Sequence, residues 1–155
     1  MRSMNTYLIF QGNCRQAMEF YKKCIGGELH LVPYADMPGG CSNFPKEARD
    51  WIMHARLSNG DVVLMASDTQ PHIPIQQGNN FFISIQCDNV QESEKLFKAF
   101  GQKGTIEMPL QETFWALRFG MLTDQFGMKW MFNLDKPGQK NKKTKKPQEP
   151  RGKRS

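Results

Sequence analysis

Three histidines are the side chains of this sequence that ordinarily titrate near neutral pH, and one of them lies inside an apolar stretch. They are His30, His54 and His72. An imidazole titrates near neutral pH, so it can exchange a proton or hydrogen-bond to a ligand. His54 stands between Met53 and Ala55 in a segment that predicts a β-strand. We expect His54 to act as a proton shuttle or as a hydrogen-bonding wall of a binding site. The alternative is a structural histidine bonded to a backbone carbonyl or to a partner subunit.

Polar and aromatic residues near predicted strand ends form a second set of candidates. Gln111 and Trp115 stand where the last hairpin begins, and an aromatic ring beside an amide suits a small, partly apolar ligand. Arg118 could bind an anion such as a carboxylate or phosphonate. Asp68 could orient a polar substrate or pair with Arg118. Tyr34 precedes a long loop and could line a lid over the site.

Each of these candidates also has a structural reading. Trp115 could anchor two parts of the chain, or a dimer contact, instead of a ligand. Arg118 could be an ordinary arginine on a strand surface. Asp68 could cap a turn at the end of its strand. The sequence leaves both readings open, so we carry all of these residues forward as substrate-binding candidates.

The four cysteines have no metal-binding or redox spacing. Cys14, Cys24, Cys41 and Cys87 form no CxxC pair. Scattered thiols in a chain without a visible signal peptide indicate a reducing, cytoplasmic setting. No run approaches the length of apolar sequence that a membrane helix needs, so we expect no membrane partner. Cys14 and Cys24 flank a predicted helix and are expected to be small core residues rather than nucleophiles.

The basic character of the chain is concentrated at its C-terminal end. The net charge is +6 overall, but residues 136–155 contribute +8 and residues 1–135 contribute −2. The terminal segment has no large apolar residue to bury, so we predict a disordered basic tail. Such a tail could make weak, salt-sensitive contacts with nucleic acid or acidic surfaces. The alternative is a solvating appendage without a partner.

The candidate residues lie in a sequence pattern that occurs twice in the chain, and we call each copy a module. The segment from Tyr7 to Lys23 and the segment from Phe82 to Lys98 both predict a strand, a turn and an amphipathic helix, with Asn13 matching Asn89. Gly60 and Gly127 mark corresponding hairpin turns. Two copies favour paired modules with a cleft between their sheets, rather than an open solenoid.

The predicted order is strand, helix and three strands in each module. For module one, about residues 5–68, the elements are 5–11, a helix to 25, 28–34, 51–57 and 62–67. For module two, about residues 81–135, they are 81–87, a helix to 100, 105–108, 115–123 and 128–134. The fold class is therefore α+β with tandem β-α-β-β-β modules. A long loop over 37–50 separates the second and third strands of module one.

This arrangement resembles the vicinal oxygen chelate superfamily, which groups glyoxalases, fosfomycin-resistance proteins and extradiol dioxygenases. Within it, the chain is similar to the PhnB-like family, also described as demethylubiquinone methyltransferase-like. The resemblance rests on Phe10, Gly12-Asn13, Phe20-Tyr21, Gly26-Gly27, Met53-His54-Ala55, Leu64 to Asp68, Gln111 to Trp115, Phe119 to Asp124 and Trp130. It implies one glyoxalase-like domain over residues 1–135, a homodimer and a small-molecule ligand in an inter-sheet cleft.

The resemblance also raises a question about metal. Metal-dependent members use His and Glu ligands on the first and last strand of each module, and these positions correspond here to Thr6, Leu64, Phe82 and Met131. None is a suitable ligand for Ni²⁺, Zn²⁺, Fe²⁺ or Mn²⁺. We therefore predict no metal and no other cofactor, because no glycine-rich loop for S-adenosylmethionine is present either.

Three functions follow from these observations, and the sequence leaves open whether the protein is an enzyme. The first is a PhnB-like protein that binds a small molecule without the usual metal. The second is a metal-dependent lyase or dioxygenase with an atypical site. The third is a dimeric scaffold whose tail contacts nucleic acid.

Overall fold

Both halves of the chain fold as a strand, a helix and three strands, as predicted. The computed structural model describes residues 1–138. Module one contains β1 (Thr6–Phe10), α1 (Cys14–Ile25), β2 (Glu28–Pro33), β3 (Ile52–Asn59) and β4 (Val62–Asp68). Module two contains β5 (Ile83–Gln86), α2 (Val90–Phe100), β6 (Thr105–Gln111), β7 (Ala116–Thr123) and β8 (Lys129–Asp135). The prediction of a disordered tail falls mainly on residues 139–155 and lies outside the described residues.

Each module forms one mixed sheet of four strands. The strand order is β1-β4-β3-β2 in sheet one and β5-β8-β7-β6 in sheet two. The first strand of each module runs parallel to the last, and the remaining pairs are antiparallel. The tandem α+β architecture is therefore confirmed. No helix among residues 1–138 is both long and apolar enough to cross a membrane.

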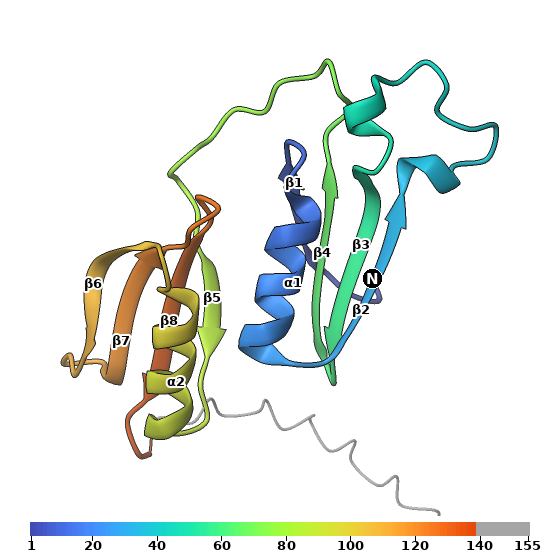
Figure 1. Ribbon diagram of the computed structural model, residues 1–155. Helices are drawn as coiled ribbons and strands as arrows, with labels where there is room; N and C mark the ends of the chain where they lie inside the picture. The colour runs from blue at the N-terminus through green and yellow to red at the C-terminus, as the bar shows by residue number, and fades with distance from the viewer. Residues whose placement is uncertain (139–155) are drawn as a thin grey trace, which may run out of the picture.

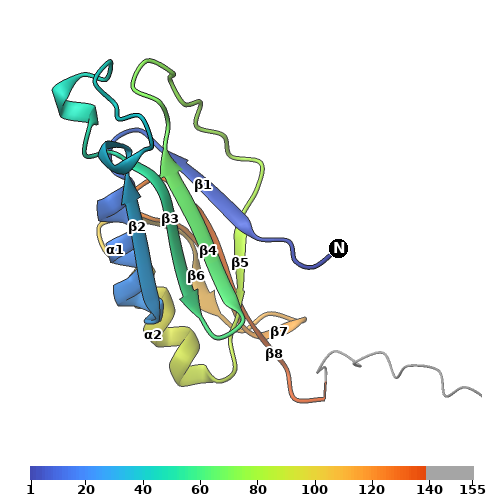
Figure 2. The same ribbon diagram turned by 90° about the vertical axis from the view of Figure 1, so that its right-hand side faces the viewer.

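One helix covers one face of each sheet and leaves the other face open. In module one, Leu8, Phe10, Ala55, Leu57 and Ala66 are buried under α1. Successive residues of a strand point to opposite faces. The alternate residues of β1 to β4 therefore lie on the uncovered face, which Figure 2 shows in front of α1. We call this the open face of sheet one.

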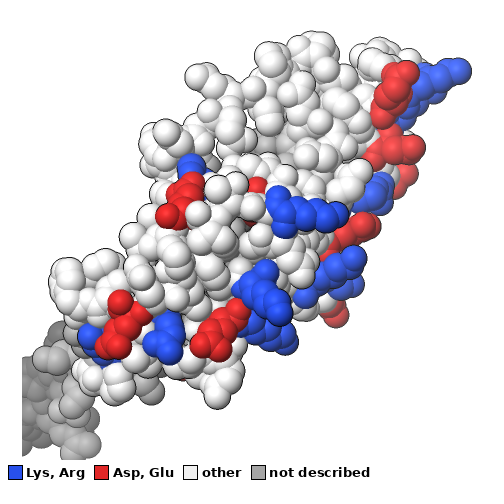
Figure 3. Space-filling view, turned by 60° about the vertical axis from the view of Figure 1, so that its left-hand side comes forward, with Lys and Arg blue, Asp and Glu red and all other residues white. Residues whose placement is uncertain are grey.

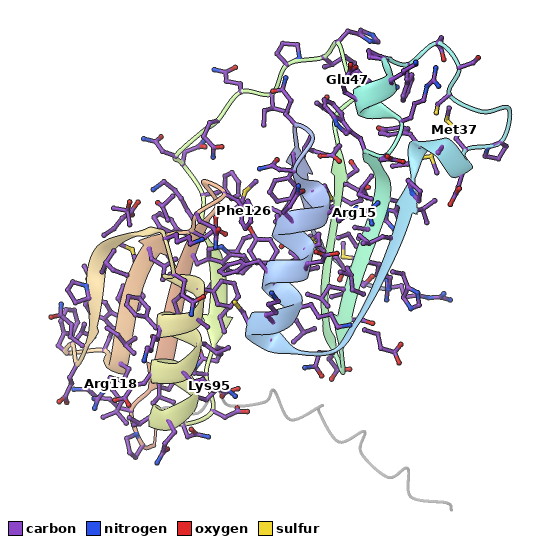
Figure 4. The ribbon with its side chains drawn as sticks, in the orientation of Figure 1. Arg15, Met37, Glu47, Lys95, Arg118 and Phe126 are labelled. Carbon is purple, nitrogen blue, oxygen red and sulfur yellow. The ribbon has the colours of Figure 1, made fainter. Side chains whose placement is uncertain are left out.

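The two helices and the covered faces of both sheets share one core. Figure 1 shows α1 between sheet one and module two. Tyr21 of α1 packs against Phe100 of α2 and Trp130 of β8, with ring centroids 6.0 and 5.3 Å apart. Phe126, from the turn between β7 and β8, points toward α1 in Figure 4 and contacts Phe20 at 5.7 Å. Aromatic side chains thus fill the space between the modules.

The two helices are capped in different ways, although each is preceded by an asparagine. In module two, the Asn89 side chain accepts a hydrogen bond from the Glu92 backbone N–H at 2.8 Å, as expected for an N-cap. In module one, the Asn13 side chain makes no such bond. The Asp68 carboxylate from β4 instead accepts from Gly12 N and Cys14 N. The first helix is therefore capped by a residue of β4, a strand that lies far from it in the sequence.

The predicted strand over 105–108 is longer in the structure. β6 extends to Gln111, and its pairing with β7 shifts in register around Met108. Pro109 lies in this irregular part and has no backbone N–H to donate, so it interrupts the ladder. The predicted loop over 37–50 is present. One short 3-10 helix, Tyr34–Asp36, directly precedes it, and another, Lys46–Ala48, lies within it.

Candidate functional site

The open face of sheet one brings together residues from all four strands. The register places His30 opposite Arg56, Arg56 opposite Met65 and Met65 opposite Tyr7, which forms one row across β2, β3, β4 and β1. His54 lies two residues from Arg56 on β3 and therefore shares this face. The face combines two imidazoles, a guanidinium and a phenol with apolar neighbours.

His54 and Tyr7 form the polar centre of this face. Tyr7 Oη lies 3.0 Å from His54 Nδ1, and the two rings are 5.7 Å apart. Tyr7 remains 43% exposed. In the neutral tautomer whose Nδ1 is unprotonated, that nitrogen accepts a hydrogen bond from the Tyr7 hydroxyl, and the proton is on Nε2, which can donate to a ligand oxygen.

Sequence reasoning identified His54 but missed Tyr7. The two residues are 47 positions apart and lie on strands separated by β4. The signal for Tyr7 is its place in the strand: Leu8 and Phe10 are buried, so Tyr7 and Ile9 must point to the opposite face. A tyrosine at such a position can contact solvent or a ligand.

The structure places Asp68 in the interior, where its carboxylate has structural partners. Asp68 is 2% exposed, and its Oδ2 accepts from Ile52 N at 2.8 Å in addition to the two bonds at the start of α1. No ion pair joins it to Arg118 within the described part of the chain. The hydrogen bonds of the Asp68 carboxylate are therefore to backbone N–H groups at the start of α1 and the start of β3.

Tyr34 also lies in the interior rather than on a lid. Its hydroxyl donates to the Asp68 backbone oxygen at 3.0 Å, and its ring packs on Phe44 at 5.0 Å. Burial and the nearby Asp68 carboxylate raise the pKa of the Tyr34 hydroxyl above its ordinary value of 10.0. Tyr34 therefore anchors the long loop to β4.

The remaining candidates belong to module two. Trp115 is 41% exposed and packs against Phe119 at 5.3 Å and the exposed Phe114 at 4.8 Å. Gln111 pairs with Phe119 at the edge of sheet two. Arg118 donates to the Leu117 backbone oxygen at 2.8 Å. Figure 4 labels Arg118 in sheet two, on the far side of α2 from module one.

The six predicted site residues therefore do not form one site within a single chain. His54 lies on the open face of sheet one, and Trp115 lies beside Phe119 in module two. The covered faces of both sheets point inward to the shared core, so their open faces point outward (Figures 1 and 2). The two open faces therefore do not face each other within the described residues of one chain.

A groove does run along the seam between the modules. It has a volume of about 670 Å³ and is lined by residues of β1, β4, α1, β5 and α2, among them Leu64, Ile83, Lys95 and Leu96. None of the six predicted residues lines it. The sequence predicted a cleft between the sheets but did not indicate these lining residues, because they come from separate stretches of chain that only the fold brings together.

The structure shows where the carried-over metal positions of module one lie. Thr6 and Leu64 pair with each other, and Leu64 is buried under α1, so both point to the covered face. Their neighbours Tyr7 and Met65 pair on the open face, because one residue of shift along a β-strand reverses the face.

The donor set does not fit the metal that the superfamily implies. In module two, Met131 pairs with Ser84, and Phe82 precedes β5 with its ring 5.1 Å from Lys129 Nζ. No cluster of three His, Cys, Asp or Glu side chains suited to a metal ion occurs among residues 1–138. Thioether, hydroxyl and aromatic groups are poor ligands for divalent zinc, nickel or manganese.

The buried thiols are also unsuited to nucleophilic chemistry. All four cysteines are free and buried. Burial raises the pKa of the Cys24 thiol, and that of the Cys87 thiol, from 9.0 to about 11. Burial likewise raises the pKa of the Cys14 thiol. The thiolate is the reactive form, so these cysteines serve as small core residues.

Figure 3, which brings the module-two side forward, shows how charge is distributed on that surface. Lys and Arg side chains alternate with Asp and Glu side chains, and broad areas between them carry no charge. This face therefore has no continuous basic area of the kind that a nucleic-acid phosphate backbone would need.

Comparisons with known proteins agree with this architecture. The family described as "Glyoxalase/Bleomycin resistance protein/Dioxygenase superfamily" matches residues 3–132. Protein YjdN of Escherichia coli (strain K12) is 33% identical over 144 residues, which cover 86% of this chain and 95% of that protein. The solved structure of protein PA1353 from Pseudomonas aeruginosa is 43% identical, with a TM-score of 0.78, covering 87% of this chain and 98% of that one.

A further solved structure shares the fold at lower identity. It is described as "Putative 3-demethylubiquinone-9 3-methyltransferase, PhnB protein" from Bacillus cereus, with 22% identity and a TM-score of 0.71 over 86% of this chain and 99% of that one. The family match spans nearly all of the described residues. This chain belongs to the glyoxalase/bleomycin resistance protein/dioxygenase superfamily.

Proposed function

We propose that this protein binds a small molecule on the open face of sheet one and does so without the usual metal of the superfamily. The observation that carries this proposal is the hydrogen bond between Tyr7 and His54 on a partly exposed apolar face. The pair places hydrogen-bonding groups beside the apolar side chains of Ile9 and Met65, and ligand sites usually combine a few polar groups with apolar surface. His54 can also exchange a proton, so acid–base catalysis is available to the same site.

We further propose that a second copy of the chain completes the site. Phe114 and Trp115 are 88% and 41% exposed, and Ile9 and Tyr7 on the opposite module are exposed to a similar degree as Trp115. Uncovered apolar patches of this kind favour association. In a homodimer, the aromatic surface of module two from one copy would cover the open face of sheet one of the other. Trp115 and Gln111 would then reach the ligand.

A small-molecule screen with matched histidine variants tests the ligand site. Thermal unfolding of the full chain would be recorded against a library of polar-headed aromatic and aliphatic compounds. A ligand at 100 times its Kd stabilises the native state by about 2.7 kcal/mol, which is readily measured. The proposal expects ligands whose stabilisation is lost in His54→Gln and kept in His72→Gln, which alters an exposed histidine in the linker.

Two other measurements test the remaining parts of this proposal. Elemental analysis of untagged protein offered Ni²⁺, Mn²⁺, Fe²⁺ and Zn²⁺ should find well under one equivalent of metal, and a stoichiometric metal would instead support the lyase or dioxygenase alternative.

Sedimentation should give a dimer that Trp115→Ala weakens. A monomer at all concentrations would contradict a shared site. Contact between the basic tail and nucleic acid stays a prediction, as does a cytoplasmic location.

A further inference from the structure

A cation stands in the middle of the open face of sheet one. Arg56 lies on the central strand β3, opposite His30 on one side and Met65 on the other. Along the strand, residues two apart lie about 7 Å from each other on the same face. The guanidinium of Arg56 and the imidazole of His54 can therefore reach the same small ligand.

Arg56 has no carboxylate partner in the described part of the chain. The ion pairs within residues 1–138 are His30–Glu28, Lys129–Glu107 and Lys136–Glu112. Glu28 lies on the outer strand β2, beside His30, with an exposed side chain. A guanidinium without a protein carboxylate keeps its fork of N–H donors for an anion, and carboxylates and phosphates match its geometry.

Sheet two offers no comparable cation. Lys129 is bonded to Glu107 and lies 3.2 Å from Thr123 Oγ1, so its charge is already balanced within the protein. The Arg118 guanidinium is bonded to its own neighbouring backbone oxygen. Among the predicted and observed candidates, Arg56 is therefore better placed than Arg118 to hold an anion.

We infer that the ligand carries an anionic group, a carboxylate or a phosphate monoester, that Arg56 binds beside His54. The apolar remainder of the ligand lies along Tyr7, Ile9 and Met65, of which Tyr7 and Ile9 are 43% and 42% exposed. His54 donates its Nε2 proton to the same anion while Tyr7 holds Nδ1. This inference rests on the proposed function, because it specifies the ligand class of the same face.

Three probes of one shape but different charge separate the ligand class from the existence of the site. Full-length protein would be titrated with 2-naphthoate, 2-naphthyl phosphate and the neutral 2-naphthamide, and backbone NMR shifts followed at Tyr7, His54 and Arg56. An anionic probe should bind about tenfold more tightly than the amide at low salt. Arg56→Gln should remove this difference, and Arg56→Lys should restore part of it. Arg15→Gln, on the exposed side of α1, should leave it unchanged.

The outcomes distinguish this inference from the proposed function. Equal binding of amide and anions, with shifts at His54, would overturn the anionic ligand and leave a ligand site on this face. If no probe shifts the signals of Tyr7 or His54 at its highest concentration, both the anionic ligand class and the ligand site on this face are overturned. The relative affinities of naphthoate and naphthyl phosphate identify which anion the site prefers. Arg56 is exposed, so Arg56→Gln should remain folded, and its thermal unfolding checks this.

Discussion

The open faces of the two sheets differ, although the modules that carry them have the same order of elements. The open face of sheet one has a Tyr7–His54 pair and an arginine, Arg56, with no carboxylate partner among residues 1–138. On sheet two, Lys129 is balanced by Glu107 within the sheet. The arginine of the first face thus has no carboxylate partner among residues 1–138, whereas the lysine of the second face is paired with Glu107.

The covered faces, by contrast, have remained similar in kind. Each module buries one aspartate whose carboxylate oxygens accept several hydrogen bonds from the surrounding chain. Asp68 accepts from Gly12 N, Cys14 N and Ile52 N. Asp124 accepts from Phe126 N, Met128 N, Tyr21 Oη and Trp130 Nε1. The comparison teaches that the two interiors share a buried aspartate acceptor, whereas the two open faces do not share their polar groups.

The largest expected effect comes from the two buried aspartates. Asp68→Asn and Asp124→Asn should each lower the free energy of unfolding by about 3 kcal/mol or more, because an amide nitrogen would face donors that need an acceptor. Urea unfolding measures the loss. Asp61→Asn, in the exposed β3–β4 turn, is the matched control and should change stability by less than about 0.5 kcal/mol. If either variant lowers the free energy of unfolding by less than about 1 kcal/mol, the two buried aspartates do not have the same structural role.

A second test measures how the buried thiols Cys24 and Cys87, one from each module, make stability depend on alkaline pH. The pKa of Cys24, and that of Cys87, is raised by burial to about 11. The unfolded chain therefore releases these protons at a lower pH than the folded chain. The stabilisation from the protonated thiols is complete below pH 9 and is lost as the pH rises toward 11. Urea midpoints at several alkaline pH values should decline less steeply in Cys24→Ala/Cys87→Ala. Some decline should remain, because burial also raises the pKa of Tyr21.

A smaller effect separates the open faces themselves. The hydrogen bond from Lys129, and then that from Thr123, holds the pKa of Glu107 below its ordinary value of 4.5. A lowered acid pKa stabilises the fold above that ordinary value, and the stabilisation is lost as the pH falls through the folded-state pKa. Glu107→Gln should therefore cost about 0.5 to 1 kcal/mol at pH 7 and almost nothing at strongly acidic pH.

The matched variant for that test is Arg56→Gln on the other sheet. Arg56 has no carboxylate partner among residues 1–138, so its loss should leave the free energy of unfolding unchanged within about 0.5 kcal/mol at either pH. Equal losses from Glu107→Gln and Arg56→Gln at pH 7 would contradict the difference between the two faces.

The smallest expected effect is at Tyr7. Tyr7→Phe should cost only about 0.5 kcal/mol, since the hydrogen bond to His54 is partly exposed. Its signature is the tautomer of His54, which ¹⁵N NMR of the imidazole reports. The wild-type ring should be protonated on Nε2, and Tyr7→Phe should shift the ring toward a mixture. An unchanged ring spectrum would show that the phenol does not determine the His54 tautomer.

The helix caps illustrate what could be predicted from the sequence and what could not. The start of α2 uses Asn89 and Glu92, which are three residues apart, so the cap is visible in the sequence. The start of α1 also has an asparagine, Asn13, but its cap comes from Asp68 at the end of β4. Only the folded sheet brings that carboxylate to the helix.

The candidate site shows the same limit. The alternation of apolar residues predicted β1 and β3, and it identified His54 as a residue on a strand. It did not show that Thr6 and Leu64 lie on the covered face, because this depends on which strands pair and in which register. Tyr7 and His54 become partners through the order β1-β4-β3, which the sequence does not state.

The sequence by itself determined the repeated order of elements, the hairpin turns at Gly60 and Gly127, and the buried stripe of α1. These features depend on residues a few positions apart, so local periodicity and turn chemistry are sufficient to predict them. The tertiary structure alone decided which carboxylates became buried acceptors, which faces stayed open and which side chains met on them. Those outcomes depend on strand order and register, where one residue of shift turns a side chain from the core to the surface.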